Sequence, residues 1–296
     1  YRRFNMNKRK GIIMAGGAGT RLHPITIGIS KQLLPVYDKP MIFYPLSVLM
    51  LSGIREIAII TTPKDQEQFI AVLGDGSQWG VSFTYIKQLS PDGLAQAYTL
   101  SEKFLAGAPS SMVLGDNIFY GHRFQEALAL AQEQEVGGTV FGYQVLDPER
   151  YGVVEFNRDG KAISIIEKPE KPASDYAVTG LYFLDGSATD RARDLTPSAR
   201  GEIEITTLLQ SYLRDDLLSV EVLGRGFAWL DTGTHVSLLK AGDFIRTLQT
   251  RQGLQLGCPE EIAFNNGWIN AEELEKRASL FSMNSYGKYL QSILEQ

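Results

Sequence analysis

The stretch from Lys10 to Leu34 reads KGIIMAGGAGTRLHPITIGISKQLL, and it gives the clearest indication of the fold. An apolar run at 12–15 ends abruptly at two glycines, which predicts a buried parallel strand whose carboxyl end opens into a loop. Glycines let such a loop turn tightly and let backbone N–H groups approach a ligand closely. Two cations, Arg21 and Lys31, follow the loop. A glycine loop with nearby fixed cations indicates a phosphate-binding site.

The common glycine motifs do not fit this loop. A dinucleotide-binding fingerprint counted from Gly17 needs a third glycine where Leu22 stands, and a P-loop counted from Gly11 needs a lysine where Gly17 stands. From the loop alone, a strand and turn with purely structural glycines is the alternative interpretation.

Composition limits the class of protein. The chain has 296 residues, of which 44% are hydrophobic and 21% charged, enough for one large domain or two small ones. A net charge of −5 argues against a nucleic-acid surface but allows a local cationic pocket. The single cysteine, Cys258, excludes an internal disulfide framework and fits a reducing compartment. Neither a membrane-spanning apolar run nor a secretory signal is recognised, so a cytoplasmic globular protein without a membrane or nucleic-acid partner is expected.

Strand and helix patterns alternate regularly up to about residue 146, which predicts right-handed βαβ units and a mostly parallel central sheet flanked by helices. The expected strands are 12–15, 56–61, 82–88, 111–114 and 139–146, and the expected helices are 42–51, 64–73, 94–105 and 123–135. Beyond this point, short strands at 153–156, 162–167 and 177–184 indicate an antiparallel-rich insertion.

The remainder of the chain returns to the α/β pattern and then becomes helical. Helices are expected at 190–195 and 204–215, strands at 218–222 and 227–230, and further helices at 235–250, 271–281 and 286–294. The simplest partition is one α/β domain over 6–240 with a helical C-terminal appendage of the same domain over 241–296.

Several polar residues follow directly on predicted strands. The glycine loop, Gln88, Asp116 and Asp231 should therefore meet in the crevice at the carboxyl ends of the strands. Each aspartate alone is more often a cap or turn residue, but two carboxylates beside a phosphate site suit Mg²⁺. The Gln88 amide can donate and accept together, as the edge of thymine or uracil requires, although a strand-end glutamine is often only solvated.

Several segments carry a family resemblance. Gly17-x-Gly19-Thr20-Arg21, followed after nine intervening residues by Lys31, resembles the signature of the sugar-nucleotide pyrophosphorylases, although many members have Pro where this chain has Ser30. The segments similar to the glucose-1-phosphate thymidylyltransferases of that family are SKQLLP at 30–35, QLSPDGLAQA at 88–97, LGDN at 114–117, YGVV at 151–154, EKP at 167–169 and WLDTGT at 229–234. The resemblance covers nearly the whole chain from Met6.

This resemblance implies a Rossmann-like fold with a nucleotide half at about 6–146 and a sugar-binding part at about 147–240. It implies a nucleotidyltransferase that condenses dTTP with glucose 1-phosphate, with Mg²⁺ bound by Asp116 and Asp231. The implied nucleotide-binding residues are Gly16, Gly17, Gly19, Thr20, Arg21, Gln88 and Gly93. The implied sugar-binding residues are Tyr151, Gly152, Glu167, Lys168 and Val178.

The charges suggest how the reaction would run. A sugar 1-phosphate is already an anion at neutral pH, so its oxygen can attack the α-phosphorus of the triphosphate without a general base. Repulsion between anions and charge on the leaving pyrophosphate are then the main obstacles. The expected catalytic groups are Arg21 and Lys31 on the pyrophosphate, Lys168 on the attacking phosphate, and Asp116 and Asp231 on the metal. Arg200 and Arg225 receive no role, and Trp229 is expected in the sugar-pocket wall or the core.

The resemblance also implies a homotetramer that feeds dTDP-L-rhamnose or related deoxysugar synthesis and is inhibited by dTDP-L-rhamnose. The segment 258–263 would belong to a region of subunit contacts and a second, regulatory nucleotide-sugar site; a packed helical layer is its alternative interpretation. Two other functions stay open at this point. One is a uridylyltransferase acting on the same sugar phosphate, and the other is a catalytically silent regulatory subunit that binds nucleotide sugars.

Overall fold

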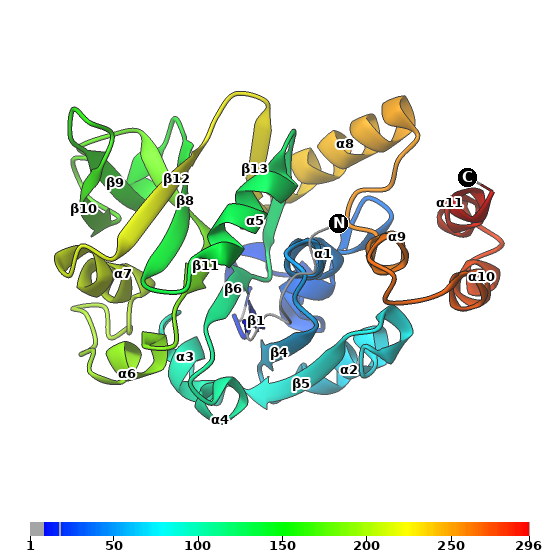
Figure 1. Cartoon of the computed structure of the whole chain (residues 1–296), viewed down its shortest axis with the longest axis horizontal. Coiled ribbons are helices and arrows are strands. Elements are labelled where there is room, and N and C mark those ends of the chain that lie inside the picture. Colours follow the sequence, from blue (N-terminus) through cyan, green and yellow to red (C-terminus); the bar gives the residue numbers. More distant parts are fainter. Residues whose placement is uncertain (1–8, 18, 296) are drawn as a thin grey trace.

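The computed structural model describes residues 9–17 and 19–295. Its centre is strand β1 (Lys10–Ala15), which lies between the parallel strands β4 (Glu56–Thr61) and β6 (Ser110–Leu114). Strand β5 (Ser82–Lys87) continues the parallel sheet beyond β4. Both faces of β1 are covered, which explains its unbroken apolar sequence. The predicted parallel core of the sheet is confirmed (Figure 1).

The antiparallel-rich part extends this sheet and does not form a layer of its own. Strand β11 (Tyr176–Leu184) runs antiparallel to β6 and also pairs with β8 (Gly138–Gln144) and β9 (Gly152–Phe156). Strand β10 (Ala162–Glu167) pairs with β9, and β12 (Leu218–Leu223) pairs in parallel with β8. The result is one nine-stranded sheet.

Helices pack on both faces of the sheet, because alternate residues of each strand point to opposite sides. Ile13 of β1 belongs to one core cluster and Ile12 to another. The first cluster contains α1 (Phe43–Leu51) and α5 (Phe124–Glu133). The second contains α3 (Gln96–Leu100), α4 (Glu102–Leu105), α6 (Ala188–Arg193) and α7 (Ile205–Arg214). Helix α2 (Gln66–Leu73) contributes Phe69 and Leu73 to the first cluster.

Some elements differ from the expected pattern. The helix expected over 94–105 is divided into α3 and α4 at Ser101. Strand β7 (Asn117–Gly121) and helix α9 (Pro259–Asn265) were not expected. Strand β7 pairs antiparallel with β13 (Phe227–Asp231) in a two-stranded ribbon separate from the main sheet. A second small ribbon joins β2 (Pro35–Val36) and β3 (Lys39–Pro40).

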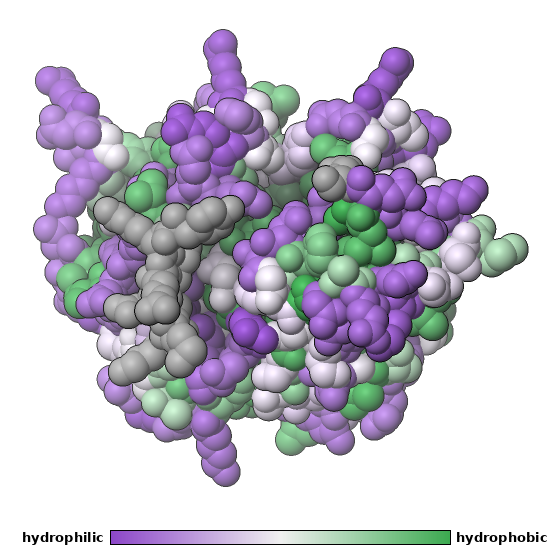
Figure 2. Space-filling model, turned by 45° about the vertical axis from the view of Figure 1, so that its right-hand side comes forward, coloured by the Kyte–Doolittle hydropathy of each residue, from purple (hydrophilic) through white to green (hydrophobic). Residues whose placement is uncertain are grey.

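The C-terminal region is helical, as expected. Helix α8 (His235–Gln252) begins with a capping box at Thr234 and ends at Gly253. Helices α9, α10 (Ala271–Leu280) and α11 (Ser285–Leu294) lie together at one side of the molecule (Figure 1). The view that brings this side forward is largely hydrophilic, with hydrophobic areas scattered among polar residues (Figure 2).

A buried polar group joins the last three helices. Glu260 of α9 is fully buried and accepts hydrogen bonds from Arg277 of α10 at 2.8 Å and from Tyr286 of α11 at 2.6 Å. Side chains of all three helices belong to the same core cluster as α1, so the appendage shares the main core. Among the described residues, every helix is too short or too polar to cross a lipid bilayer.

Candidate active site

The glycine loop lies where β1 ends, at the carboxyl edge of the sheet. A Cβ atom at Gly16 would come within 2.0 Å of the Gln88 side-chain oxygen, so the close approach of the loop to Gln88 requires glycine there. Gly19 has φ of +62° and precedes a short 3-10 helix, Thr20–Leu22, which carries Arg21. The hydroxyl of Thr26 donates to the Gly19 carbonyl at 2.7 Å and fastens this turn.

A small cavity of about 160 Å³ lies directly over this loop. Its lining includes Gly17, Gly19, Thr20, Arg21, Lys31, Asp116 and Gly233. Lys31 is buried, and its ammonium group donates to the Asp116 carboxylate. The structure therefore brings together the glycine loop, both expected pyrophosphate-binding cations and one expected metal ligand.

Asp231 lies beside Asp116, but the strand pairing that brings it there differs from the expected one. It ends β13, and the antiparallel register of the β7–β13 ribbon sets it opposite Asn117, the residue after Asp116. The two aspartates meet because of this ribbon and not because both follow strands of the central sheet.

Asn117 lines the site as well, although its sequence position did not predict a role. Its side-chain oxygen accepts from the Trp229 indole at 2.6 Å and from the Gly180 backbone at 3.1 Å. Its side-chain nitrogen donates to Asp116 at 2.9 Å. Asn117 thus fixes the Asp116 carboxylate relative to β11 and β13. The sequence signal was only its place after Asp116, where a turn residue is equally common.

The two carboxylates have the electrostatics of a cation site. Burial raises the pKa of Asp231 above its ordinary value, and the negative charge of Asp116 adds to this shift. Lys31, Arg21 and Arg150 oppose it. A hard divalent cation between the two carboxylates would offset both burial and repulsion, so the pair fits such an ion. Within the described residues, no group of three or more His, Cys, Asp and Glu side chains is placed to hold a metal ion. Mg²⁺ commonly needs only one or two carboxylates from the protein.

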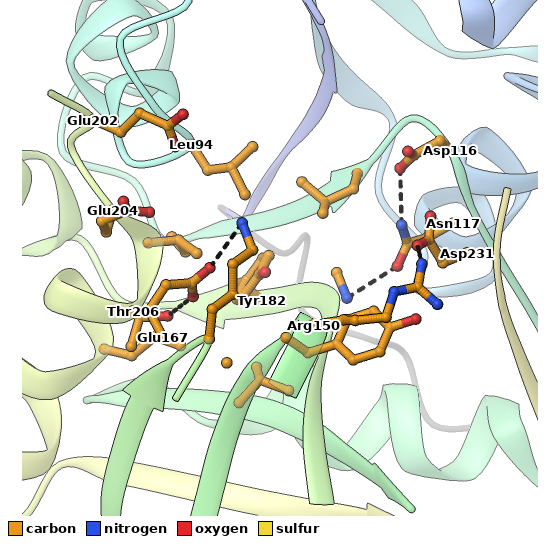
Figure 3. Close-up of a pocket in the computed structure, with 18 of the residues that line it drawn as sticks. Leu94, Asp116, Asn117, Arg150, Glu167, Tyr182, Glu202, Glu204, Thr206 and Asp231 are labelled. Carbon is orange, nitrogen blue, oxygen red and sulfur yellow. Dashed lines mark hydrogen bonds and ion pairs between the residues drawn. The ribbon is translucent and has the colours of Figure 1, made fainter. Parts of the chain in front are cut away.

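A larger cavity of about 520 Å³ continues from this point toward β9, β10 and α7. Arg21 and Asp116 line both cavities and therefore connect them. Figure 3 shows Asp116, Asn117, Asp231 and Arg150 at one side of the larger cavity and Glu167, Glu202, Glu204 and Thr206 at the other. The expected sugar-binding residues Tyr151, Gly152, Glu167, Lys168 and Val178 all line it.

Strand pairing organises the far side of this cavity. Glu167 ends β10 opposite Gly152, which begins β9. Thr206 of α7 donates to the Glu167 carboxylate at 2.5 Å. Lys168 has φ of +44°, a left-handed conformation that is rare outside glycine, and its ammonium lies 3.5 Å from Glu167. Such a conformation at a cavity wall is typical of residues positioned for function.

The two arginines without an expected role separate in the structure. Arg200 donates to Glu204 at 2.7 Å and lies 3.4 Å from Glu167, so it borders the larger cavity through its acidic partners. Arg225 lies exposed in the turn between β12 and β13. Trp229 lines the cavity and packs on Tyr151 with a ring-centre distance of 5.1 Å.

Gln88 lies beside the glycine loop, and neither Gln88 nor Gly93 lines either cavity. Gln88 follows β5, and its amide nitrogen donates to Gln96 at 2.6 Å. Its buried oxygen, aimed at Gly16, finds no hydrogen-bond partner among the described residues. Gly93 packs against the backbone of Ile203, where a Cβ atom would come within 2.4 Å.

Known proteins are similar to this chain in sequence and in fold. The family model described as nucleotidyl transferase matches residues 10–247. A glucose-1-phosphate thymidylyltransferase of Xanthomonas campestris pv. campestris (strain B100) is 62% identical over 98% of this chain and 99% of its own length. One of Mycolicibacterium smegmatis is 54% identical over 97% of this chain and 99% of its own length.

Two solved structures are also similar. A Bacillus anthracis protein assigned as a glucose-1-phosphate thymidylyltransferase, in complex with a sucrose, has a TM-score of 0.75 and 41% identity. The match covers 80% of this chain and 95% of that one. A UDP-glucose pyrophosphorylase complexed with UDP-glucose has a TM-score of 0.71 and 24% identity, covering 81% and 98%, and supports the fold alone.

Proposed function

The chain belongs to the nucleotidyl transferase family, and from this premise we propose that it transfers a thymidylyl group from dTTP to glucose 1-phosphate. The products are dTDP-glucose and pyrophosphate. The observation that carries the proposal is the convergence of Arg21, Lys31, Asp116, Lys168 and Asp231 on two connected cavities. The names of the near full-length relatives specify the substrates.

The two cavities suit the two substrates. The smaller one, at the glycine loop, would hold the β- and γ-phosphates of dTTP against backbone N–H groups, Arg21 and Lys31. The larger one, lined by carboxylates, hydroxyls and Trp229, would hold the sugar. Carboxylates accept hydrogen bonds from sugar hydroxyls, and an aromatic face packs on a sugar ring.

The chemistry consists of one displacement at the α-phosphorus. An oxygen of the sugar phosphate attacks this phosphorus in line, the bond to the bridging oxygen breaks, and pyrophosphate leaves with that electron pair. Arg21 would neutralise the charge that grows on the pyrophosphate and on the transferring group. Lys168, at the wall of the larger cavity, would bind the attacking phosphate and aim its oxygen. The reaction needs no general base, because the nucleophile is already ionised.

Asp116 and Asp231 would hold a divalent cation, which we take to be Mg²⁺. When bound, the cation supplies charge neutralisation between the nucleotide and the sugar phosphate. Asn117 keeps Asp116 aimed at this position.

For the base, we propose that Gln88 and Gly93 bind the thymine edge. The unpartnered oxygen of Gln88 and its place beside the glycine loop support this assignment. Gln88 donates to Gln96, and Gln96 donates to Asp92 at 2.9 Å, so a chain of amides fixes the orientation of Gln88.

The test is pyrophosphate release from each of the four nucleoside triphosphates mixed with glucose 1-phosphate and Mg²⁺. We expect dTTP to give the highest kcat/KM. Faster turnover of UTP would favour a uridylyltransferase, and absence of release with every nucleotide would favour a silent nucleotide-sugar-binding subunit.

Regulation and assembly are part of the same proposal. A cavity of about 550 Å³ lies between α1 and α9, far along the chain from the glycine loop, and Tyr44, Phe124, Cys258 and Glu261 are among its lining residues. This cavity supports a second nucleotide-sugar site, and we propose that dTDP-L-rhamnose inhibits the protein there in a cytoplasmic homotetramer. A crystal soaked with dTDP-L-rhamnose and showing density only at the glycine loop would contradict the second site.

A further inference from the structure

Arg150 is a cavity residue with no role in the reaction described so far. It ends a short 3-10 helix, Pro148–Arg150, just before Tyr151, and it lines the larger cavity. One end of its guanidinium donates to Asp147 at 2.6 Å, and the other lies 3.6 Å from the Asp231 carboxylate. Figure 3 shows Arg150 directed toward Asp231.

The two contacts of Arg150 differ in strength. The contact with Asp147 has hydrogen-bond geometry, and the guanidinium also lies 5.3 Å from the centre of the Tyr151 ring. The contact with Asp231 is longer than a hydrogen bond, and the Arg150 side chain is 41% exposed. Arg150 is therefore anchored at the cavity wall, while its contact with Asp231 can be exchanged.

Asp231 has a further need for positive charge. It is a mostly buried carboxylate beside Asp116, whose own cation, Lys31, is buried. A divalent cation bound to both carboxylates would take the position of the Arg150 charge at Asp231 and repel the guanidinium. Besides Asp147, which already accepts from Arg150, the phosphate of the sugar substrate would then be an anion within the same cavity that the freed end of the guanidinium could bind.

Building on the proposed function, we propose that Arg150 is a positioning residue that competes with the divalent cation for Asp231. When the cation binds, the end of the guanidinium that faces Asp231 turns to the sugar phosphate, while the other end keeps its hydrogen bond to Asp147 and its place over Tyr151. Binding of the cation and binding of the sugar phosphate would therefore strengthen each other. The cation releases the Arg150 guanidinium from Asp231, and the phosphate then binds the released guanidinium.

The first test measures Mn²⁺ binding to the free, full-length protein from the electron paramagnetic resonance signal of unbound Mn²⁺. Arg150→Gln removes the competing charge and should bind Mn²⁺ about two- to fivefold more tightly than the unsubstituted protein, as expected for a partly exposed ion pair. Arg150→Lys keeps the charge and should stay within about twofold. The matched control is Arg193→Gln, which removes the same charge from a surface pair with Asp190 and Glu102.

The second measurement is steady-state kinetics. Arg150→Gln should raise KM for glucose 1-phosphate about tenfold and change kcat and KM for dTTP little, because the contact is made to the sugar phosphate. Equal or weaker Mn²⁺ binding by Arg150→Gln relative to Arg193→Gln would overturn the competition, and an unchanged KM would overturn the movement to the phosphate.

A further variant separates this inference from the proposed function. Asp231→Asn should lose most Mn²⁺ binding. If Asp231→Asn binds Mn²⁺ as well as the unsubstituted protein does, the cation does not bind at Asp231, and both the metal assignment and the role of Arg150 fall. If Asp231→Asn loses binding and Arg150→Gln matches Arg193→Gln, only the role of Arg150 falls.

Discussion

At the scale of single residues, the site depends on cations whose backbone positions are set before any substrate arrives. Arg21 is carried by a 3-10 helix that is fastened to the glycine loop, and Lys31 is buried against Asp116. Preorganised charges stabilise a transition state well because they do not have to reorient during the reaction. The predictions at this scale follow from removing them one at a time.

Arg21→Ala should lower kcat by roughly 10²-fold, the loss typical of removing one preorganised donor from a developing anion. Pyrophosphate release at saturating dTTP and glucose 1-phosphate measures this effect. The matched control is Arg193→Ala on the surface, which should keep kcat. Turnover of Arg21→Ala within about threefold of the control would remove Arg21 from the mechanism.

Asn117→Ala should both destabilise the protein and slow the reaction. It leaves the Trp229 indole and the Gly180 amide without their acceptor, at about 1–3 kcal/mol for each buried group left unpaired. Asn117→Asp keeps an acceptor for both but loses the donor to Asp116 and adds a like charge. It should therefore retain more stability than Asn117→Ala and less activity than the unsubstituted protein. Urea denaturation and turnover of both variants check this separation.

Asp231→Asn should stabilise the protein at neutral pH without divalent cations. Because the folded-state pKa of Asp231 is raised by burial and by Asp116, the folded protein holds this proton more tightly than the unfolded chain. Ionised Asp231 therefore opposes folding, and stability falls as pH rises from the ordinary value of 3.8 through the raised value. The gain from Asp231→Asn should be present at pH 7 and should disappear as the pH falls through the raised pKa to the ordinary value. A variant less stable than the unsubstituted protein at pH 7 would contradict this account.

At the scale of elements, the glycine loop and its strand could be predicted, but the β7–β13 ribbon could not. An apolar run followed by glycines is a local signal, and β1 ends at Ala15 as expected. Strand β7 follows the turn residues Gly115 and Asp116 directly, and its partner strand begins only at Phe227. Pairing over that distance leaves no periodic signal in either segment. The two aspartates therefore lie together as expected, but through a strand pairing that the sequence did not indicate.

The C-terminal helices give a second prediction at this scale. Arg277→Ala leaves the fully buried Glu260 carboxylate without its cation, and losing one partner of a buried pair costs about 3–5 kcal/mol. Lys276→Ala, which removes an exposed partner of Glu272 on the same helix, should cost less than about 0.5 kcal/mol. Urea denaturation compares the two, and hydrogen exchange should show faster opening of α10 and α11 in Arg277→Ala. Equal stability of both variants would mean that the pair of Glu260 and Arg277 does not stabilise the fold.

At the scale of the whole molecule, the sequence predicted the class of fold, but it did not predict that the parallel and antiparallel strands form one sheet. The alternation of strands and helices indicated a parallel sheet, and β5, β4, β1 and β6 form it. The later strands were expected as an insertion, yet β11 pairs directly with β6 and makes them part of one sheet. Apolar strand sequences specify burial but not the neighbouring strand, so this join could not be predicted. The helical appendage shares the main core, which supports one domain as the proposed partition.

The surroundings of Trp229 should make the intrinsic fluorescence of the protein sensitive to substrate binding. The chain has three tryptophans, and Trp229 alone lines the larger cavity, whereas Trp79 and Trp268 pack near one another beside Gly80, close to the C-terminal helices. Indole emission depends on hydrogen bonding and on nearby charge, and Trp229 bonds Asn117 beside both aspartates. Loading of the sugar phosphate should therefore change fluorescence without any added label. Trp229→Phe should abolish that change, while Trp268→Phe should only dim a constant background.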